Sequence, residues 1–230
     1  MANRSSLLVC VALYAGSCAT SGGDSLTPER LTGPLHWKID NPQSVGGEST
    51  TVVGQPRVVE TSQGQAVQFD GVDDALFVDA APLQGLEKFT AEIVFRPAQN
   101  GPREQRFFHL QEDETSNRVL FETRLTDDDR WFLDTFIRSG GTGVTLFAED
   151  FTHPIGPWYH AAIVVDGSRM HHYVNGQLEL SSELAYKPQG PGRTSLGVRI
   201  NRVSWYKGEI REVRVTPNVL APAEFLKPVS

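Results

Sequence analysis

The chain has 230 residues and a formal net charge of −7, and 39% of its residues are hydrophobic. This length suits one large all-β sandwich, and the apolar content is sufficient to fill its core. Because no block of Lys and Arg stands out, the composition argues against a nucleic-acid partner. An acidic surface also disfavours electrostatic docking on anionic lipid.

The N-terminal segment over residues 1–18 has the three-part layout of a secretory signal peptide. A short segment with one cation, Arg4, precedes an uninterrupted apolar run over residues 7–15, and small residues follow. The run is too short for a membrane-spanning helix, which needs about 20 residues. We therefore expect residues 1–18 to direct export of the protein.

Both cysteines, Cys10 and Cys18, lie in this segment. The remaining chain is predicted to fold without a disulfide, and Cys-ligated zinc and a cysteine nucleophile are excluded there. Residues 15–18 resemble a bacterial lipobox, which implies lipid attachment at Cys18 in the cell envelope. Ordinary cleavage near Ala19, giving a secreted protein, is the alternative. In either case residues 19–34 form a polar tether.

Short apolar segments separated by Gly and Pro make up residues 35–230, with no sustained helical periodicity. Strands are expected at residues 52–53, 58–59, 66–69, 75–78, 89–96, 106–110, 118–125, 131–138, 158–165, 170–175, 194–200 and 208–215. Asp-Gly and Asn-Gly dipeptides supply tight turns between several of them. This pattern predicts an all-β fold, a two-sheet antiparallel β-sandwich. Residues 221–226 could form one short helical turn.

Three stretches resemble the laminin G-like branch of the concanavalin A-like lectin/glucanase superfamily. They are an Asp-Gly turn within residues 65–78, a hairpin opened by Trp-Tyr over residues 158–176, and a second Trp-Tyr pair within residues 205–225. The resemblance implies a laminin G-like jelly roll over residues 35–230. It implies little about function, because this fold hosts lectins, hydrolases, lyases and structural modules.

A cluster of carboxylates, Asp70, Asp73 and Asp74, follows the first of these turns. Carboxylates are the hard oxygen ligands that calcium requires, and the resemblance implies calcium at this edge in some members. Relatives often have Asp where this chain has Arg211, which would remove a ligand and add a positive charge. The alternative is a turn capped by carboxylates that accept backbone N–H bonds. Calcium therefore stays open as a cofactor, and no histidine spacing supports zinc.

Polar residues inside the central predicted strands form the candidate ligand site. Alternation puts Glu122 and Arg124 on one face of residues 118–125, and Phe107, His109 and Gln111 on one face of the preceding strand. Such groups are costly to bury unless they are paired or exposed in a groove. The expected groove residues are His109, Gln111, Glu122, Arg124 and Asp134. A structural Glu122–Arg124 ion pair is the alternative.

No catalytic residues are assigned. The Glu-x-Asp-x-x-Glu run of the hydrolase branch, which sets carboxylates about 5–5.5 Å apart in retaining enzymes, is missing. Arg124 is also expected to keep a neighbouring carboxylate ionised and unfit as an acid. We therefore expect a non-catalytic module at the cell surface for carbohydrate, an extended or acidic glycan. A polysaccharide lyase or hydrolase, and a domain that binds a cell-surface protein or is purely structural, are the alternatives.

Overall fold

The computed structural model describes Met1 and residues 30–227. The predicted signal, Cys18 and most of the tether therefore lie outside the described residues. The described part contains 17 strands and one 3₁₀ turn over Pro222–Glu224, as predicted near the C-terminus. None of its helices is long and apolar enough to cross a membrane.

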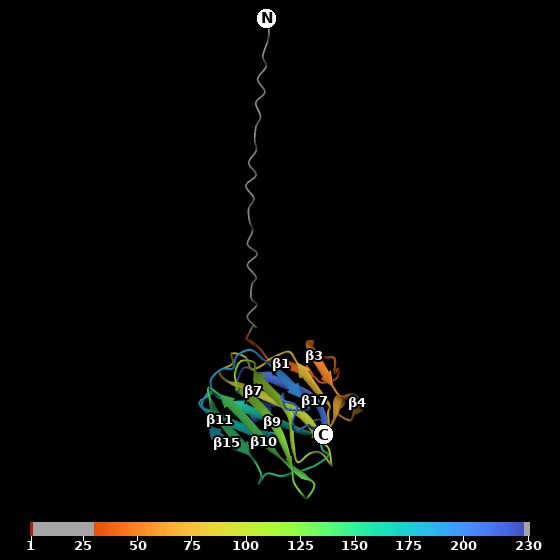
Figure 1. Cartoon of the computed structure of the whole chain (residues 1–230). Helices are drawn as coiled ribbons and strands as arrows, with labels where there is room; N and C mark the ends of the chain where they lie inside the picture. Colours follow the sequence, from red (N-terminus) through yellow and green to blue (C-terminus); the bar gives the residue numbers. More distant parts are fainter. Residues whose placement is uncertain (2–29, 228–230) are drawn as a thin grey trace.

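Two antiparallel sheets form the sandwich (Figure 1). The eight-stranded sheet has the order β15-β14-β13-β7-β17-β5-β4, with β1 paired to β17. Its strands are β1 Leu35–Lys38, β4 Arg57–Thr61, β5 Gly64–Asp70, β7 Phe89–Pro97, β13 Tyr159–Val165, β14 Arg169–Val174, β15 Gln177–Glu183 and β17 Lys207–Thr216. The hairpin of β13 and β14 confirms the predicted turn between them.

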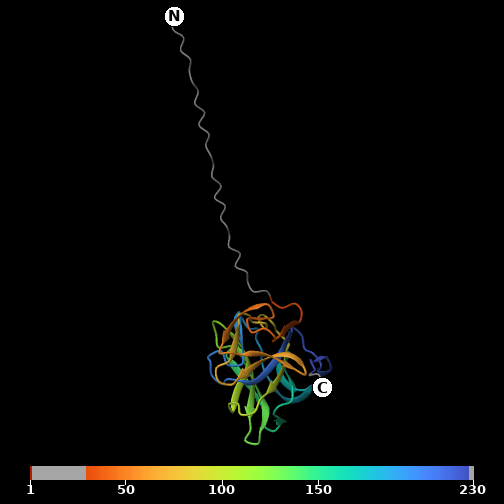
Figure 2. The same cartoon turned by 90° about the vertical axis from the view of Figure 1, so that its right-hand side faces the viewer.

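The nine-stranded sheet has the order β11-β10-β9-β8-β16-β6-β3-β2, with β12 paired to β10. Its strands are β2 Ser44–Val45, β3 Glu48–Val53, β6 Ala75–Val78, β8 Glu104–Glu112, β9 Arg118–Leu125, β10 Arg130–Ser139, β11 Thr142–Phe147, β12 His153–Pro154 and β16 Gly192–Leu196. Figure 2 shows from a second side that the folded body consists of strands and the loops that connect them. The predicted two-sheet antiparallel sandwich is confirmed.

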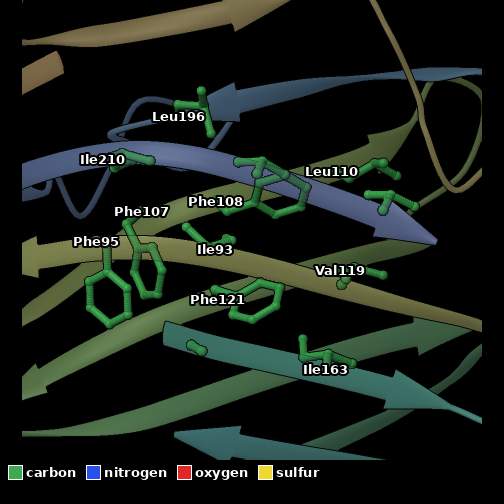
Figure 3. Close-up of a cluster of buried hydrophobic side chains, with 14 of the residues drawn as sticks. Ile93, Phe95, Phe107, Phe108, Leu110, Val119, Phe121, Ile163, Leu196 and Ile210 are labelled. Carbon is green, nitrogen blue, oxygen red and sulfur yellow. The ribbon is translucent and has the colours of Figure 1, made fainter. Parts of the chain in front are cut away.

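The hydrophobic core lies between the sheets, because alternate residues of each strand point inward. Figure 3 shows Phe95 of β7 beside Phe107 of β8, whose rings stack with centroids 4.3 Å apart. Both side chains are fully buried, as are Phe121 and Ile163 from the facing sheets. Burying one such side chain contributes about 1.5–3 kcal/mol, so this cluster is a main source of stability.

Strand β8 contains a bulge at Phe107, which has no partner on β9. On either side of it, Arg106 pairs with Glu122 and Phe108 pairs with Phe121. Phe107 and Phe108 therefore both point into the core. The prediction that Phe107 shares a face with His109 is wrong, because an extra residue breaks the period of two.

Strand β16 ends at Leu196, although a strand was predicted over residues 194–200. Gly197 has a φ of +84°, and a Cβ there would collide with the ring of Phe69. Glycine is therefore required at this position. Residues 197–206 then form a loop that folds back over the nine-stranded sheet, where Val198 packs against Phe77 of β6.

Candidate functional site

The outer face of the nine-stranded sheet, which is the side away from the core, carries the predicted ligand residues. Across β9 and β10, Glu122 lies directly opposite Asp134, and Arg124 lies opposite Phe132. Arg106 of β8 lies opposite Glu122 on its other side. The alternation of the sequence therefore brings Glu122, Arg124 and Asp134 together, as expected.

Arg124 is the centre of an ion-pair network on this face. Its Nη2 lies 2.7 Å from Asp134 Oδ2 and 3.3 Å from Glu122 Oε2, and its Nη1 lies 2.6 Å from Glu104 Oε2. Arg106 contacts Glu104 as well, and its Nε lies 3.0 Å from Glu122 Oε2. The Glu122–Arg124 ion pair considered as the alternative is thus present, within a larger network.

Glu104 and Arg106 were missed as members of this network. Glu104 precedes the predicted strand over residues 106–110, whereas β8 begins at Glu104 itself. Arg106 lies just before the bulge, where counting by two from His109 assigns it to the core side. A signal for Arg106 does exist, because the two successive apolar residues Phe107 and Phe108 break the alternation between Arg106 and His109.

Burial dominates the electrostatics of the network. The side chains of Glu122 and Asp134 are only 4% and 3% exposed. The pKa of Glu122 is raised to about 7, mainly by burial. The charge of Asp134 also raises it, whereas the charges of Arg106 and Arg124 act to lower it. Burial also raises the pKa of Asp134, although Arg124 opposes it. Arg124 thus acts to lower the pKa of Glu122, as expected, but burial outweighs it.

The other two predicted ligand residues lie apart from the network. His109 is fully buried under the loop over residues 197–206, and its Nδ1 accepts a hydrogen bond of 2.9 Å from the backbone N–H of Ile200. Burial lowers its pKa to about 3, with the charge of Arg199 as the next cause. Gln111 is half-buried at the far end of the face, opposite Arg118.

Two adjoining hollows on the outer face share Arg124. The smaller, of about 180 Å³, is lined by Arg106, Arg118, Leu120, Glu122, Arg124, Asp134, Phe136, Thr145 and Arg199. The larger, of about 450 Å³, is lined by Arg103, Glu104, Arg124, Leu125, Thr126, Asp127, Phe132, Phe147 and Glu149. Phe147 is 44% exposed, and the Arg124 guanidinium lies 5.6 Å from its ring centre. An extended, partly aromatic surface results.

The predicted metal cluster is held together by backbone hydrogen bonds. Ligand atoms of Asp70, Asp73 and Asp74 lie within 4.8 Å of one another. Asp70 Oδ1 accepts N–H bonds from Val72, Asp73 and Asp74 at 2.8–3.3 Å. Asp74 accepts the N–H of Gln55 at 2.6 Å and that of Asp70 at 3.1 Å. Several of the carboxylate oxygen atoms that calcium would need as ligands therefore already accept backbone hydrogen bonds.

The pKa values of Asp70 and Asp74 depend on the same backbone hydrogen bonds and on burial. Burial acts to raise the pKa of Asp70, but its backbone N–H bonds outweigh burial and the pKa is lowered. Burial raises the pKa of Asp74. Arg211 donates instead to the backbone oxygen of Gln63 and contacts Glu212.

Residues 70–225 match the laminin G family model described as the Concanavalin A-like lectin/glucanases superfamily. The chain belongs to this superfamily. The predicted laminin G-like resemblance is thereby confirmed. No curated protein matches this sequence significantly.

Solved structures of the same jelly-roll fold include three kinds of protein. Domain 4 of an extracellular arabinanase from Geobacillus stearothermophilus, in complex with arabinotriose, has a TM-score of 0.64 at 18% identity, covering 85% of this chain and 97% of that domain. A pentraxin from Limulus polyphemus has a TM-score of 0.55 at 17% identity, covering 68% and 77%. The receptor-binding domain of botulinum neurotoxin D has a TM-score of 0.60 at 14% identity, covering 83% and 50%. These identities indicate a shared fold alone.

Proposed function

We propose that this domain is an exported, non-catalytic module that binds an extended glycan across the outer face of the nine-stranded sheet. One observation carries the proposal: two adjoining hollows share Arg124 and together combine charged and aromatic side chains. A ligand longer than one sugar could occupy both hollows at once.

The chemistry of these hollows suits sugars. Carboxylate and guanidinium groups bond hydroxyl groups strongly, because charge-assisted hydrogen bonds are stronger than neutral ones. Phe132 and Phe147 pack edge to face, with centroids 4.8 Å apart, and offer an apolar wall for a sugar ring. The carboxylates that surround Arg124 hold it in place before any ligand arrives, which reduces the entropy cost of binding.

Two further facts support a glycan ligand and an exported protein. The arabinanase domain with the same fold was solved with arabinotriose. The apolar run before Cys18 is typical of a signal peptide. We propose attachment to the cell envelope through Cys18, or secretion, with a cell-surface protein as the other class of partner.

A glycan array followed by titration calorimetry tests this proposal. We expect binding of at least one extended glycan and a loss of about tenfold in affinity for Phe147→Ala. Leu178→Ala is a matched control, because Leu178 is 52% exposed on β15 of the other sheet. Absence of binding to every polysaccharide on the array would reject the glycan ligand.

A second candidate, a polysaccharide-active enzyme, is favoured by the carboxylate pair. Burial raises the pKa of Glu122 to about 7, which suits a proton donor near neutral pH. Release of reducing ends, or of unsaturated products that absorb ultraviolet light, would indicate catalysis. Such activity should then disappear in Glu122→Gln, and its complete absence supports the binding module.

A further inference from the structure

A cluster of arginines lies at one end of the outer face. Across β16, β8, β9 and β10, the residues Arg193, Gln111, Arg118 and Arg138 are direct neighbours in one row. Arg199, from the loop over residues 197–206, lines the smaller hollow together with Arg118. We call Arg118, Arg138, Arg193 and Arg199 the arginine cluster.

No member of the arginine cluster forms an ion pair with a carboxylate within the described residues. The ion pairs of residues 30–227 include none of its members. Arg118 donates to the Ser116 carbonyl oxygen and lies 4.6 Å from the ring centre of Phe136. The Nε atoms of Arg118 and Arg138 are both buried without a hydrogen-bond partner.

This arrangement costs stability in the free protein. Like charges directly opposite each other on neighbouring strands repel, as Arg118 and Arg138 do. Burial lowers the pKa of Arg118, and the charges of Arg199 and Arg138 lower it further, whereas the charge of Glu122 acts to raise it. The chain has 28 acidic residues against 21 Lys and Arg, so acidic residues were not lacking to pair with them.

The ion-pair network on the same face provides the contrast. Arg124 contacts three carboxylates, so its guanidinium is already neutralised. The arginine cluster has free donors and no ion pair of its own among the described residues, although the charge of Glu122 acts to raise the pKa of Arg118. We infer that the arginine cluster, rather than Arg124, binds the anionic groups of an acidic polysaccharide, which deepens and rests on the proposed glycan-binding function.

The position of the cluster favours a single acidic chain. It lies within a sheet face of a protein with a net charge of −7, which weakens long-range attraction of a large anionic surface. Three strand spacings of about 4.8 Å separate the ends of the row, so it could contact more than one charged group. Planar guanidinium groups bind carboxylate and sulfate in a bidentate manner.

Titration of the exported protein with defined polymers tests the inference. The probes are dextran sulfate, alginate, neutral dextran and duplex DNA. We expect binding to dextran sulfate or alginate that weakens with salt, and the stronger of the two identifies sulfate or carboxylate. Arg118→Gln/Arg138→Gln should weaken it about tenfold or more. Arg169→Gln, which removes one positive charge from β14 of the other sheet, should weaken it much less than Arg118→Gln or Arg138→Gln alone.

A second readout separates binding from folding. Because Arg138→Gln removes a repelling charge, its melting temperature should be no lower than that of the unmodified protein. Equal losses in the cluster variant and Arg169→Gln, or equal binding of DNA, would overturn the inference in favour of general polyanion attraction. Binding of neutral glycans alone would reject the inference and leave the proposed function intact, whereas no binding of any glycan would reject both.

Discussion

The ring of His109 and the backbone of Ile200 fasten the loop over residues 197–206 to strand β8. The hydrogen bond of 2.9 Å runs from the Ile200 N–H to His109 Nδ1, which must therefore be unprotonated. Burial and three arginines lower the pKa of the ring to about 3. Since Arg199 belongs to this loop, the contact also positions one wall of the smaller hollow.

A pH dependence follows from His109. Its folded pKa lies below its unfolded value of 6.5, so the unfolded state binds more protons between about pH 3 and 6.5. This contribution to stability is present above pH 6.5 and is lost as the pH falls towards 3. In His109→Asn, whose oxygen can still accept the Ile200 N–H, the acid-side loss should be smaller by on the order of 2–4 kcal/mol. Urea unfolding at several pH values measures it, and parallel profiles would contradict the assignment.

Glu122 should contribute with the opposite sign. Its folded pKa of about 7 lies above the ordinary value of 4.5, so the folded state binds the extra proton. The resulting stability is present below pH 4.5 and is lost as the pH rises through 7. The stability of Glu122→Gln relative to the unmodified protein should therefore increase between pH 4.5 and 7, by on the order of 1–3 kcal/mol. A constant difference across that range would show that Glu122 titrates normally.

Two phenylalanines should respond very differently to the same substitution. Phe107→Ala should lower the free energy of unfolding by about 3–5 kcal/mol, because Phe107 is fully buried against Phe95. Phe147→Ala should change it by about 0.5 kcal/mol or less, since Phe147 is 44% exposed. Chemical denaturation of both variants is sufficient. Comparable losses in the free energy of unfolding would mean that Phe147 contributes to stability as a core residue does.

We expect calcium to act weakly, through the turn that contains Asp70, Asp73 and Asp74. A ligand that binds the folded state alone raises the melting temperature. Because Asp70 and Asp74 already accept backbone N–H bonds, we expect a rise of no more than about 2 °C at millimolar calcium, equivalent to a fraction of 1 kcal/mol. Any such shift should disappear in Asp73→Asn/Asp74→Asn. A shift that persists in the double variant would place the site elsewhere.

The lipobox-like sequence over residues 15–18 predicts that a lipid on Cys18 attaches the protein to the membrane. In Cys18→Ser the protein should move from the membrane fraction to the soluble fraction, because one residue supplies the site for the lipid. Fractionation followed by immunoblotting measures this. If the variant fractionates as the unmodified protein does, the anchor is not at Cys18, although export is unaffected.

The sandwich and part of the candidate site could be predicted from the sequence, because regular strands place alternate residues on one face. The period of two holds along β9 and β10, so Glu122, Arg124 and Asp134 could be assigned to one face. It fails where the chain leaves regular geometry. The bulge at Phe107 puts two successive residues on the core side, and β16 ends at Leu196 although apolar residues recur at Val198 and Ile200, so a period of two continued through either point assigns residues wrongly.

The arginine cluster could not be predicted in the same way. Arg193 and Arg118 are far apart in the sequence, and they share a row only because β16 lies beside β8. Strand order within a sheet depends on long-range packing rather than on any local pattern. Arg199 joins them through the loop that replaces the end of the predicted strand.

The bulge in β8 adds to the core side of the strand and leaves its outer face unchanged. If residue 107 were removed, Arg106 and His109 would still point outward, and Phe108 would still point inward, in strict alternation. Phe107 is thus the extra residue of the bulge, and it adds one aromatic ring to the core without changing which of its neighbours face outward. Removal of this one residue would therefore reduce the core side of β8 while the residues of its outer face keep their order.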